Sequence, residues 1–212
     1  MVVVNSLGPV EARVVGVLVE KQMTTPDVYP LTLAGVVAGC NQSTNRQPVM
    51  ALDDDEVERA LVRLHDAGWA TPVRRPGDRA TKYRHKVAEA LEVDRAAQAV
   101  LAVLLLRGSQ TSGELRSRTD RYISFGTLDE VETVLDALEE QGLVRRLPRL
   151  PGQSQRRIVE LLSAEAEADG GVSVPPPAEE SPATAPPDLA DRLAALEERF
   201  DELLRRLGET DL

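Results

Sequence analysis

Apolar residues recur with helical spacing in two stretches of the chain that resemble each other. In "VERALVRL" (57–64) the apolar side chains fall at i, i+3, i+4 and i+7, the spacing that lines one face of a helix. The same spacing returns in "VETVLDAL" (131–138). Aligning residues 57–87 with residues 131–161 also superimposes the glycines that follow these stretches, which indicates an internal repeat of one structural unit.

Both copies of the repeat carry the same signals for the ends of a helix. Residues 53–56 and 127–130 fit the S/T/D-x-x-E pattern, in which the first and last side chains bond free N–H groups at a helix start. Gly68 and Gly142 stand where a left-handed residue ends a helix. Each copy is therefore predicted to hold a helix that begins at the acidic pattern and ends at the glycine.

A pair of extended stretches follows each glycine. The stretches are separated by turn sequences, "RPGD" at 75–78 in the first copy and "LPGQ" at 150–153 in the second. Two extended stretches joined by a short turn are typical of a β-hairpin. Each copy is therefore predicted to be a helix followed by a hairpin.

Two further helical patterns precede the repeated helix in each copy. They lie at 10–18 and 31–40 in the first copy, and at 97–105 and 112–118 in the second. Three helices followed by a two-stranded hairpin form the winged-helix variant of helix-turn-helix. We therefore predict a mainly α fold with small β-hairpins, in the α+β class, built from tandem winged helix-turn-helix domains at 1–90 and 91–165.

Composition changes beyond residue 165. The stretch 169–187 contains six prolines and almost nothing to bury, so residues 166–187 are predicted to be an acidic, disordered linker. Residues 188–212 are predicted to form a C-terminal coiled-coil helix, because apolar positions alternate by four and three. We favour a homodimer through this helix, and the alternative is that the helix docks back onto its own domains. The seam consists of Leu189, Leu193, Leu196, Phe200, Leu203 and Leu207.

The net charge of −10 is concentrated in this C-terminal part of the chain. Residues 1–90 hold 11 Lys/Arg and 11 Asp/Glu, residues 91–165 hold 10 and 12, and residues 166–212 hold 4 and 12. The predicted domains are therefore close to neutral, and only their local charge patterns bear on their partners.

The sequence gives no sign of membrane insertion or export. The longest apolar run, 99–106, is far shorter than the roughly 20 residues that span a bilayer. The N-terminus lacks the basic-then-apolar pattern of a secretory leader. The lone Cys40 cannot form an intrachain disulfide, which suits a reducing compartment. We expect a cytoplasmic protein.

Several phrases of the sequence resemble one bacterial family. They are "EKQMTTPDVYPL" (20–31), "CNQSTNRQPVM" (40–50), "TKY" (81–83) and "LLLRGSQTSGELRSR" (104–118). In these phrases the chain is similar to the YceH family, and the resemblance covers most of residues 10–160. It implies a tandem winged-helix fold, in agreement with the repeat, and it brings no substrate, cofactor or catalytic residue.

The residues give little support to catalysis. His65 and His85 are the only histidines and are predicted on different elements, so no transition-metal ligand set is expected. Cys40 ends an apolar helical run, where a buried structural thiol is favoured over a nucleophile. The acidic run 53–55 is interpreted as the start of a helix rather than as a magnesium site. We therefore predict a protein that is not an enzyme and uses no cofactor.

Basic residues gather in the two predicted hairpins. Residues 71–86 contain six Lys or Arg against one Asp, and residues 143–159 contain five Arg and no acid. Clusters of this density suit contact with phosphates. The polar stretch 39–50, interpreted as the turn of the first helix-turn-helix, is a further candidate contact loop. The candidate contact residues are Gln42, Asn45, Arg46, Arg74, Arg75, Arg79, Lys82, Arg84, Arg145, Arg146, Arg149, Arg156 and Arg157.

The helices that would read DNA bases carry the opposite charge. Residues 53–67 hold six acids against two Arg, and residues 127–141 hold six acids and no base, so the phosphates of a groove would repel them. We favour a DNA-associated, regulator-like protein that contacts the backbone of double-stranded DNA through basic hairpins. One alternative is a protein-interaction module of a chromosome- or envelope-related complex, with the acidic helices facing a basic partner. The other is that the hairpin arginines pair with acidic helices of the same chain.

Overall fold

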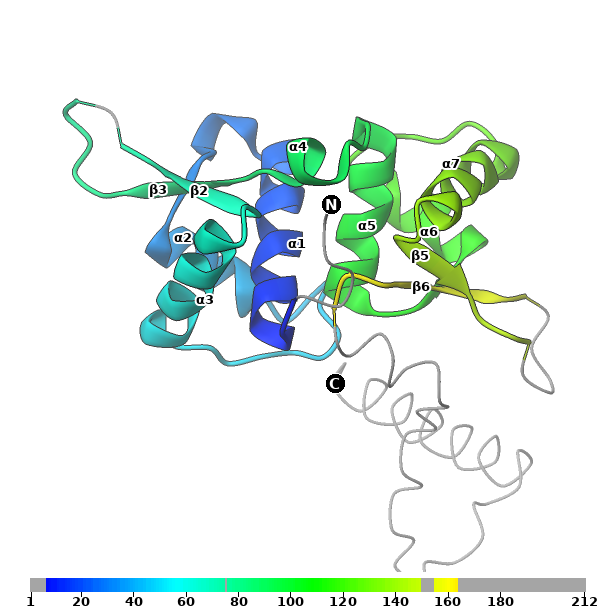
Figure 1. Ribbon diagram of the computed structural model, residues 1–212, viewed down its shortest axis with the longest axis horizontal. Coiled ribbons are helices and arrows are strands. Elements are labelled where there is room, and N and C mark those ends of the chain that lie inside the picture. The colour runs from blue at the N-terminus through cyan, green and yellow to red at the C-terminus, as the bar shows by residue number, and fades with distance from the viewer. Residues whose placement is uncertain (1–6, 75, 150–154, 164–212) are drawn as a thin grey trace, which may run out of the picture. The chain divides into compact units, whose positions relative to one another are not determined.

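The computed structural model describes residues 7–74, 76–149 and 155–163, which lie in one compact unit of the chain (Figure 1). Their elements fall into a first half (7–86) and a second half (92–163), joined by helix α4 (Val87–Leu91). The α+β class is confirmed, because helices are combined with small antiparallel sheets. The predictions for Arg75, the turn at 150–153, the linker 166–187 and the helix 188–212, with the seam from Leu189 to Leu207, concern residues outside this description.

Both halves place their elements in the same order. The first half contains α1 (Pro9–Thr24), the 3₁₀ turn η1 (Pro26–Val28), β1 (Leu31–Thr32), α2 (Leu33–Cys40), α3 (Asp54–Asp66), β2 (Ala70–Val73) and β3 (Lys82–His85). The second half contains α5 (Arg95–Arg107), β4 (Gln110–Thr111), α6 (Ser112–Thr119), α7 (Leu128–Glu140), β5 (Val144–Arg146) and β6 (Arg157–Glu160). Each half has a three-stranded antiparallel sheet with its last strand in the middle, in the orders β1-β3-β2 and β4-β6-β5.

The ends of α3 follow the sequence signals. The N–H of Glu56 donates to Oδ1 of Asp53 over 2.8 Å, and the N–H of Asp53 donates to Oε2 of Glu56 over 2.9 Å. Gly68 follows α3 with a φ of 80°, and Gly142 follows α7 with a φ of 70°, the left-handed conformation that glycine adopts without strain. The predicted starting pattern of α3 and both predicted glycine ends are confirmed.

The start of α7 forms the predicted pattern only in part. Oγ1 of Thr127 accepts the N–H of Glu130 over 3.3 Å, as predicted. The carboxylate of Glu130, however, accepts the N–H of Gly126 over 3.0 Å. Both bonds satisfy donors that a helix start leaves free, so α7 is capped with a different choice of partners.

Helices α1 and α5 form the centre of the described structure. Every residue from Ala12 to Glu20 and from Ala97 to Leu106 is buried, so both helices are covered on all sides. They pack against each other, and the buried side chains of both halves belong to one hydrophobic core (Figure 1). Burial of one Val or Leu side chain contributes about 1.5–3 kcal/mol to the free energy of folding. This shared core is therefore the main source of stability for the contact between the two halves.

A buried polar side chain closes the same strand end in each half. His85, the last residue of β3, is 4% exposed, and its Nδ1 accepts the N–H of Val87 over 3.2 Å. Glu160, the last residue of β6, is 7% exposed, and its Oε2 accepts the N–H groups of Leu162 (2.6 Å) and Ser163 (3.0 Å). Different residue types therefore perform the same task, which is to satisfy the backbone where the chain leaves the sheet.

Gly39→Ala is expected to destabilise the contact between α2 and α1. A Cβ at residue 39 would lie 2.6 Å from Cγ1 of Val17, a β-branched side chain that is stiff in a helix. Gly35→Ala, on the same helix, is the matched control, because its Cβ would meet no atom closer than 3.5 Å. Both variants gain helix propensity, so we expect Gly39→Ala to be about 1–3 kcal/mol less stable than Gly35→Ala in denaturant unfolding. Equal stabilities would contradict this packing.

Candidate functional site

The β2–β3 hairpin carries the first group of predicted contact residues. Arg74 and Arg79 are exposed and Lys82 is half-buried, and among the described residues none of the three has an acidic partner within ion-pair distance. Arg84 pairs with Glu89 of α4 over 3.1 Å, and both side chains are largely exposed. Solvent screens such a pair, so it holds Arg84 only weakly.

The β5–β6 hairpin carries the second group. Arg145, Arg149 and Arg156 are exposed, and no acid of the described residues lies within ion-pair distance of them. Arg157 differs, because Nη1 lies 3.5 Å from Oε2 of Glu114 on α6. Of these four arginines, three are exposed and one pairs within its own half.

Arg146 is committed to helix α7. Its Nη2 lies 2.9 Å from the carboxylate of Glu132 and 2.6 Å from that of Asp136, and its Nη1 pairs with Glu139. The hydrogen bonds that Arg146 donates to these carboxylates, led by the one to Glu132, raise its pKa. Arg146 therefore fits the alternative in which a hairpin arginine pairs with an acidic helix of the same chain, and its role as a contact residue stays a prediction.

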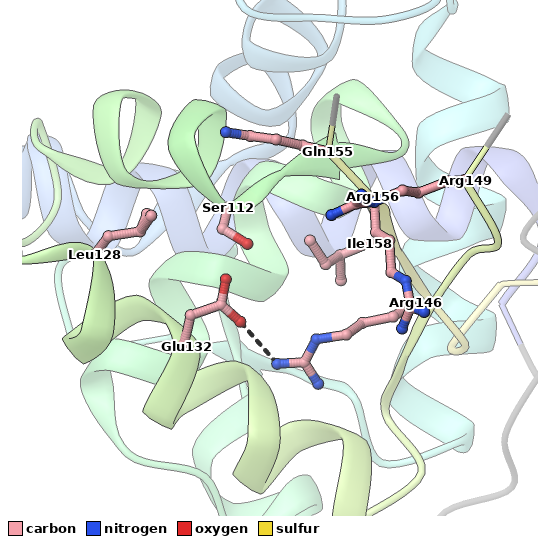
Figure 2. A pocket seen from close by; sticks show the side chains of 8 residues that line it. All are labelled: Ser112, Leu128, Glu132, Arg146, Arg149, Gln155, Arg156 and Ile158. Atoms are coloured by element: carbon pink, nitrogen blue, oxygen red, sulfur yellow. Dashed lines mark hydrogen bonds and ion pairs between the residues drawn. The ribbon is translucent and has the colours of Figure 1, made fainter. Parts of the chain in front are cut away.

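A pocket of 420 Å³ opens between the β5–β6 hairpin and helices α6 and α7. Figure 2 shows Arg149 and Arg156 on the hairpin side of this pocket, with Ser112 and Glu132 on the side of the helices. Ile158 of β6 adds an apolar surface to the lining. The pocket thus places two exposed arginines of the predicted basic hairpin opposite side chains of α6 and α7, which the sequence alone did not indicate.

The loop between α2 and α3 turns its polar residues inward. Arg46, predicted as a contact residue, is only 4% exposed, so that prediction is corrected. Gln42 is half-buried and accepts a hydrogen bond from Nη2 of Arg46 over 2.9 Å. Asn41 exchanges two hydrogen bonds with the backbone of Leu52, of 2.7 and 2.8 Å, which hold the two ends of the loop together.

The partner of Arg46 is Glu20, a fully buried carboxylate of α1. Its Oε2 lies 2.5 Å from Nη2 of Arg46. Its Oε1 accepts hydrogen bonds from Nη2 of Arg121 (2.7 Å) and from the hydroxyl of Tyr122 (3.2 Å), both in the turn between α6 and α7. One carboxylate therefore joins α1 and the loop of the first half to a turn of the second half.

The ionised form of Glu20 is favoured by this arrangement. Burial opposes ionisation, but the hydrogen bond and charge of Arg46, with the charges of Lys21 and Arg121, outweigh it and lower the pKa of Glu20. Burial and the charge of Glu20 raise the pKa of Tyr122, which keeps its hydroxyl protonated and able to donate. We call Glu20, Arg46, Arg121 and Tyr122 the Glu20 network.

The same loop also contacts α5 directly. The N–H of Gln47 donates to the carbonyl of Leu106 over 2.8 Å. Arg107 donates from Nη2 to Oδ1 of Asn45, which adopts the left-handed conformation with a φ of 60°. Asn45, the remaining predicted contact residue of this loop, is thus engaged within the chain. The stretch 39–50 therefore connects the first half to α5 of the second half through direct hydrogen bonds.

Sequence reasoning missed the Glu20 network because its members are far apart along the chain. Glu20 is separated by 26 residues from Arg46 and by 101 from Arg121. One local signal was present: Glu20 directly follows the apolar run "VVGVLV" (14–19). A charge at that place in a helix is rarely tolerated unless a partner neutralises it.

The histidines and the cysteine do not gather into a site. Cys40 is buried, as predicted, and burial raises the pKa of its thiol to about 12, which keeps it protonated at neutral pH. Burial lowers the pKa of His85 to about 4, and His65 lies exposed on α3. Within 7–74, 76–149 and 155–163, no group of three His, Cys, Asp or Glu side chains is placed to hold a metal ion.

None of the helices in these ranges has the length and apolarity needed to cross a membrane.

The fold and these contacts together define a class of protein. It is an α+β chain whose two halves have the same order of elements and are connected through the buried carboxylate of Glu20. The chain belongs to the family described as "Protein of unknown function, DUF480", whose model matches residues 7–153. It is 49% identical over 173 residues to a UPF0502 protein of Geobacter metallireducens, covering 81% of this chain and 78% of that protein. It is 41% identical over 208 residues to the UPF0502 protein YceH of Escherichia fergusonii, covering 94% and 96%.

The resemblance to the YceH family is thereby confirmed. Glu20 and Arg46 lie in the phrases "EKQMTTPDVYPL" and "CNQSTNRQPVM", which carried that resemblance. Arg107, which contacts the loop, lies in "LLLRGSQTSGELRSR". The phrases that carry the family resemblance therefore supply contacts between the two halves.

Glu20→Gln is expected to destabilise the protein by about 3–5 kcal/mol in denaturant unfolding near neutral pH, because Arg46 stays buried without its charge partner. Glu11→Gln is the matched control on the same helix. Glu11 pairs with Arg63, which is 56% exposed, so its loss should cost about 1 kcal/mol or less. Similar losses in both variants would contradict the role of the Glu20 network.

The pH dependence of this difference follows from the sign of the pKa shift. Because folding lowers the pKa of Glu20, its contribution is complete above the ordinary glutamate value of 4.5 and is lost as the pH falls toward the folded value. The stability gap between the wild type and Glu20→Gln should therefore narrow in acid below that pH. A gap that widens in acid would contradict an ionised Glu20.

Proposed function

We propose that this chain is a non-enzymatic, cytoplasmic, tandem winged-helix protein that associates with the backbone of double-stranded DNA. The order helix, short strand, helix, helix, hairpin in both halves supports the winged-helix assignment. The two sheet orders, β1-β3-β2 and β4-β6-β5, support it as well, because the first strand of each half pairs beside the hairpin. In proteins that contain a helix-turn-helix, the elements near the second helix contact DNA.

The observation that carries the proposal is the set of outward-facing cations on the hairpins. Five arginines there are exposed and have no acidic partner among the described residues: Arg74, Arg79, Arg145, Arg149 and Arg156. Both hairpins extend from the helices that bear the core (Figure 1). Free guanidinium groups on a projecting hairpin are suited to phosphate oxygens, which supply most of the affinity in sequence-independent binding.

The charge on α3 and α7 favours backbone contact over base reading. Asp54, Asp55 and Glu58 are exposed on α3, and Asp129 and Glu140 are exposed on α7. Carboxylates on a helix that enters a groove would face the phosphates on both sides at short range. We therefore assign the DNA contacts to the hairpins and expect little dependence on base sequence.

A second function is favoured by the acidic surface of α7. Asp129, Glu130 and Glu140 are exposed, and no cation of the described residues forms an ion pair with them. A basic surface of another protein would fit this face, as in a protein-interaction module. Complete absence of duplex binding in the titration below would favour this function over DNA association.

The duplex titration is designed around matched pairs of arginines. A labelled duplex is titrated with wild type, with Arg74→Gln/Arg79→Gln, and with Arg59→Gln/Arg95→Gln, at several salt concentrations. Arg59 and Arg95 are also exposed, so both variants have the same net charge and only the position differs. We expect wild-type affinity to fall steeply with salt, and the slope of log K against log salt to decrease by about 2 in the hairpin variant alone.

Two results of the titration would contradict DNA association. One is the absence of wild-type binding at low salt, and the other is an equal loss of affinity in both double variants.

The same titration on a chain that ends at residue 187 tests the homodimer that we propose to form through residues 188–212, because losing bivalency lowers the apparent affinity for DNA. Light scattering should give the mass of two subunits for the wild type and of one subunit for that shortened chain, and an unchanged number of subunits would contradict a homodimer through this helix.

A further inference from the structure

The pocket between the β5–β6 hairpin and helices α6 and α7 has a lining that favours an anion. Arg146, Arg149 and Arg156 line it, and Glu132 is the only acid among its described lining residues. Ile158 contributes apolar surface, which excludes water and strengthens the electrostatic attraction inside the pocket. The lining therefore carries a net positive charge in a partly enclosed space.

The one acid of this lining is already neutralised. Glu132 lies 2.9 Å from Nη2 of Arg146, the ion pair marked in Figure 2, and Arg146 also binds Asp136 over 2.6 Å. Arg146 is thus committed to α7, and Glu132 cannot oppose an incoming anion with its full charge. Arg149 and Arg156 remain exposed and without an acidic partner in the described part of the chain.

Two polar positions of this lining correspond to apolar residues in the first half. Strand pairing makes Arg146 on β5 equivalent to Pro72 on β2. Ser112, the first residue of α6, is equivalent to Leu33, the first residue of α2. At these two positions the polar side chains are particular to the second half and do not follow from the shared arrangement of elements.

We propose that this pocket binds a phosphate group, with Arg149 and Arg156 as its charged contacts and Ser112 and Gln155 as neutral hydrogen-bond donors. A guanidinium group offers parallel N–H donors that fit two oxygens of a phosphate. The hydroxyl and amide groups can donate to the remaining oxygens. Where the phosphate belongs to a duplex backbone, this inference rests on the proposed function; a free phosphate group presents the same oxygens.

The test uses the full-length, ¹⁵N-labelled protein and follows backbone amide signals during titration with inorganic phosphate at constant ionic strength, held with chloride. We expect saturable shifts at Ser112, Gln155 and Arg156. In Arg149→Gln/Arg156→Gln, phosphate affinity should fall by roughly tenfold or more, because two charge-assisted contacts are lost. Arg74→Gln/Arg79→Gln, with the same change in net charge, should bind phosphate like the wild type.

The two substituted arginines are exposed, so the remaining amide signals should keep their positions and show that the variant is folded. The proposal is overturned if phosphate causes no saturable shift, if the shifts survive in Arg149→Gln/Arg156→Gln, or if an acidic peptide shifts these signals and phosphate does not.

A second titration with duplex DNA separates the two sources of phosphate. Shifts at the same amides with both ligands support a backbone contact in the pocket. Phosphate binding without any duplex binding supports the pocket for a free phosphate group and contradicts the proposed function. Duplex binding that leaves Ser112 and Gln155 unshifted, combined with saturable shifts by inorganic phosphate, assigns the pocket to a free phosphate group while the proposed function stands.

Discussion

A buried carboxylate is the constraint on which the described structure depends. Glu20 has no exposed side-chain surface, and an unpaired charge in that place would cost several kcal/mol. The chain meets this requirement with Arg46 from the loop after α2 and Arg121 from the turn after α6. Because these cations come from different halves, the need to neutralise one group also fixes how the two halves meet. The loop 41–52 is held in place without a helix or strand of its own.

The same electrostatic rule divides the basic residues into two groups. Arg46 and Arg146 are bound by carboxylates of their own chain and serve the fold. Arg74, Arg149 and Arg156 are exposed on the hairpins, where no acid in the described part of the chain neutralises them. A count of arginines per segment could not separate these groups. The division also makes the two halves unequal, because among the described residues only the second hairpin forms ion pairs with its acidic helix.

Local signals in the sequence were sufficient for much of the fold. The one-sided apolar spacing of α3 and α7, the pattern at Asp53 and the glycines that end these helices depend only on neighbouring residues, so they were predicted correctly. The strands β1 and β4 have two residues each, too short for any alternation, and they exist only because β3 and β6 offer an edge. Arg46 was wrongly predicted to be a surface contact for a related reason. Whether an arginine is buried depends on an acid that is distant along the chain, and the polarity of its neighbours does not reveal that partner.

The central claim is that the Glu20 network holds the two halves in one fixed arrangement. Residual dipolar couplings of backbone amides, measured on the wild-type protein in a dilute aligned medium, test this most directly. Couplings from residues 7–86 and from residues 92–163 should fit one common alignment tensor. Two clearly different tensors, with good fits only when each half is treated separately, would show that the halves reorient and would contradict the claim.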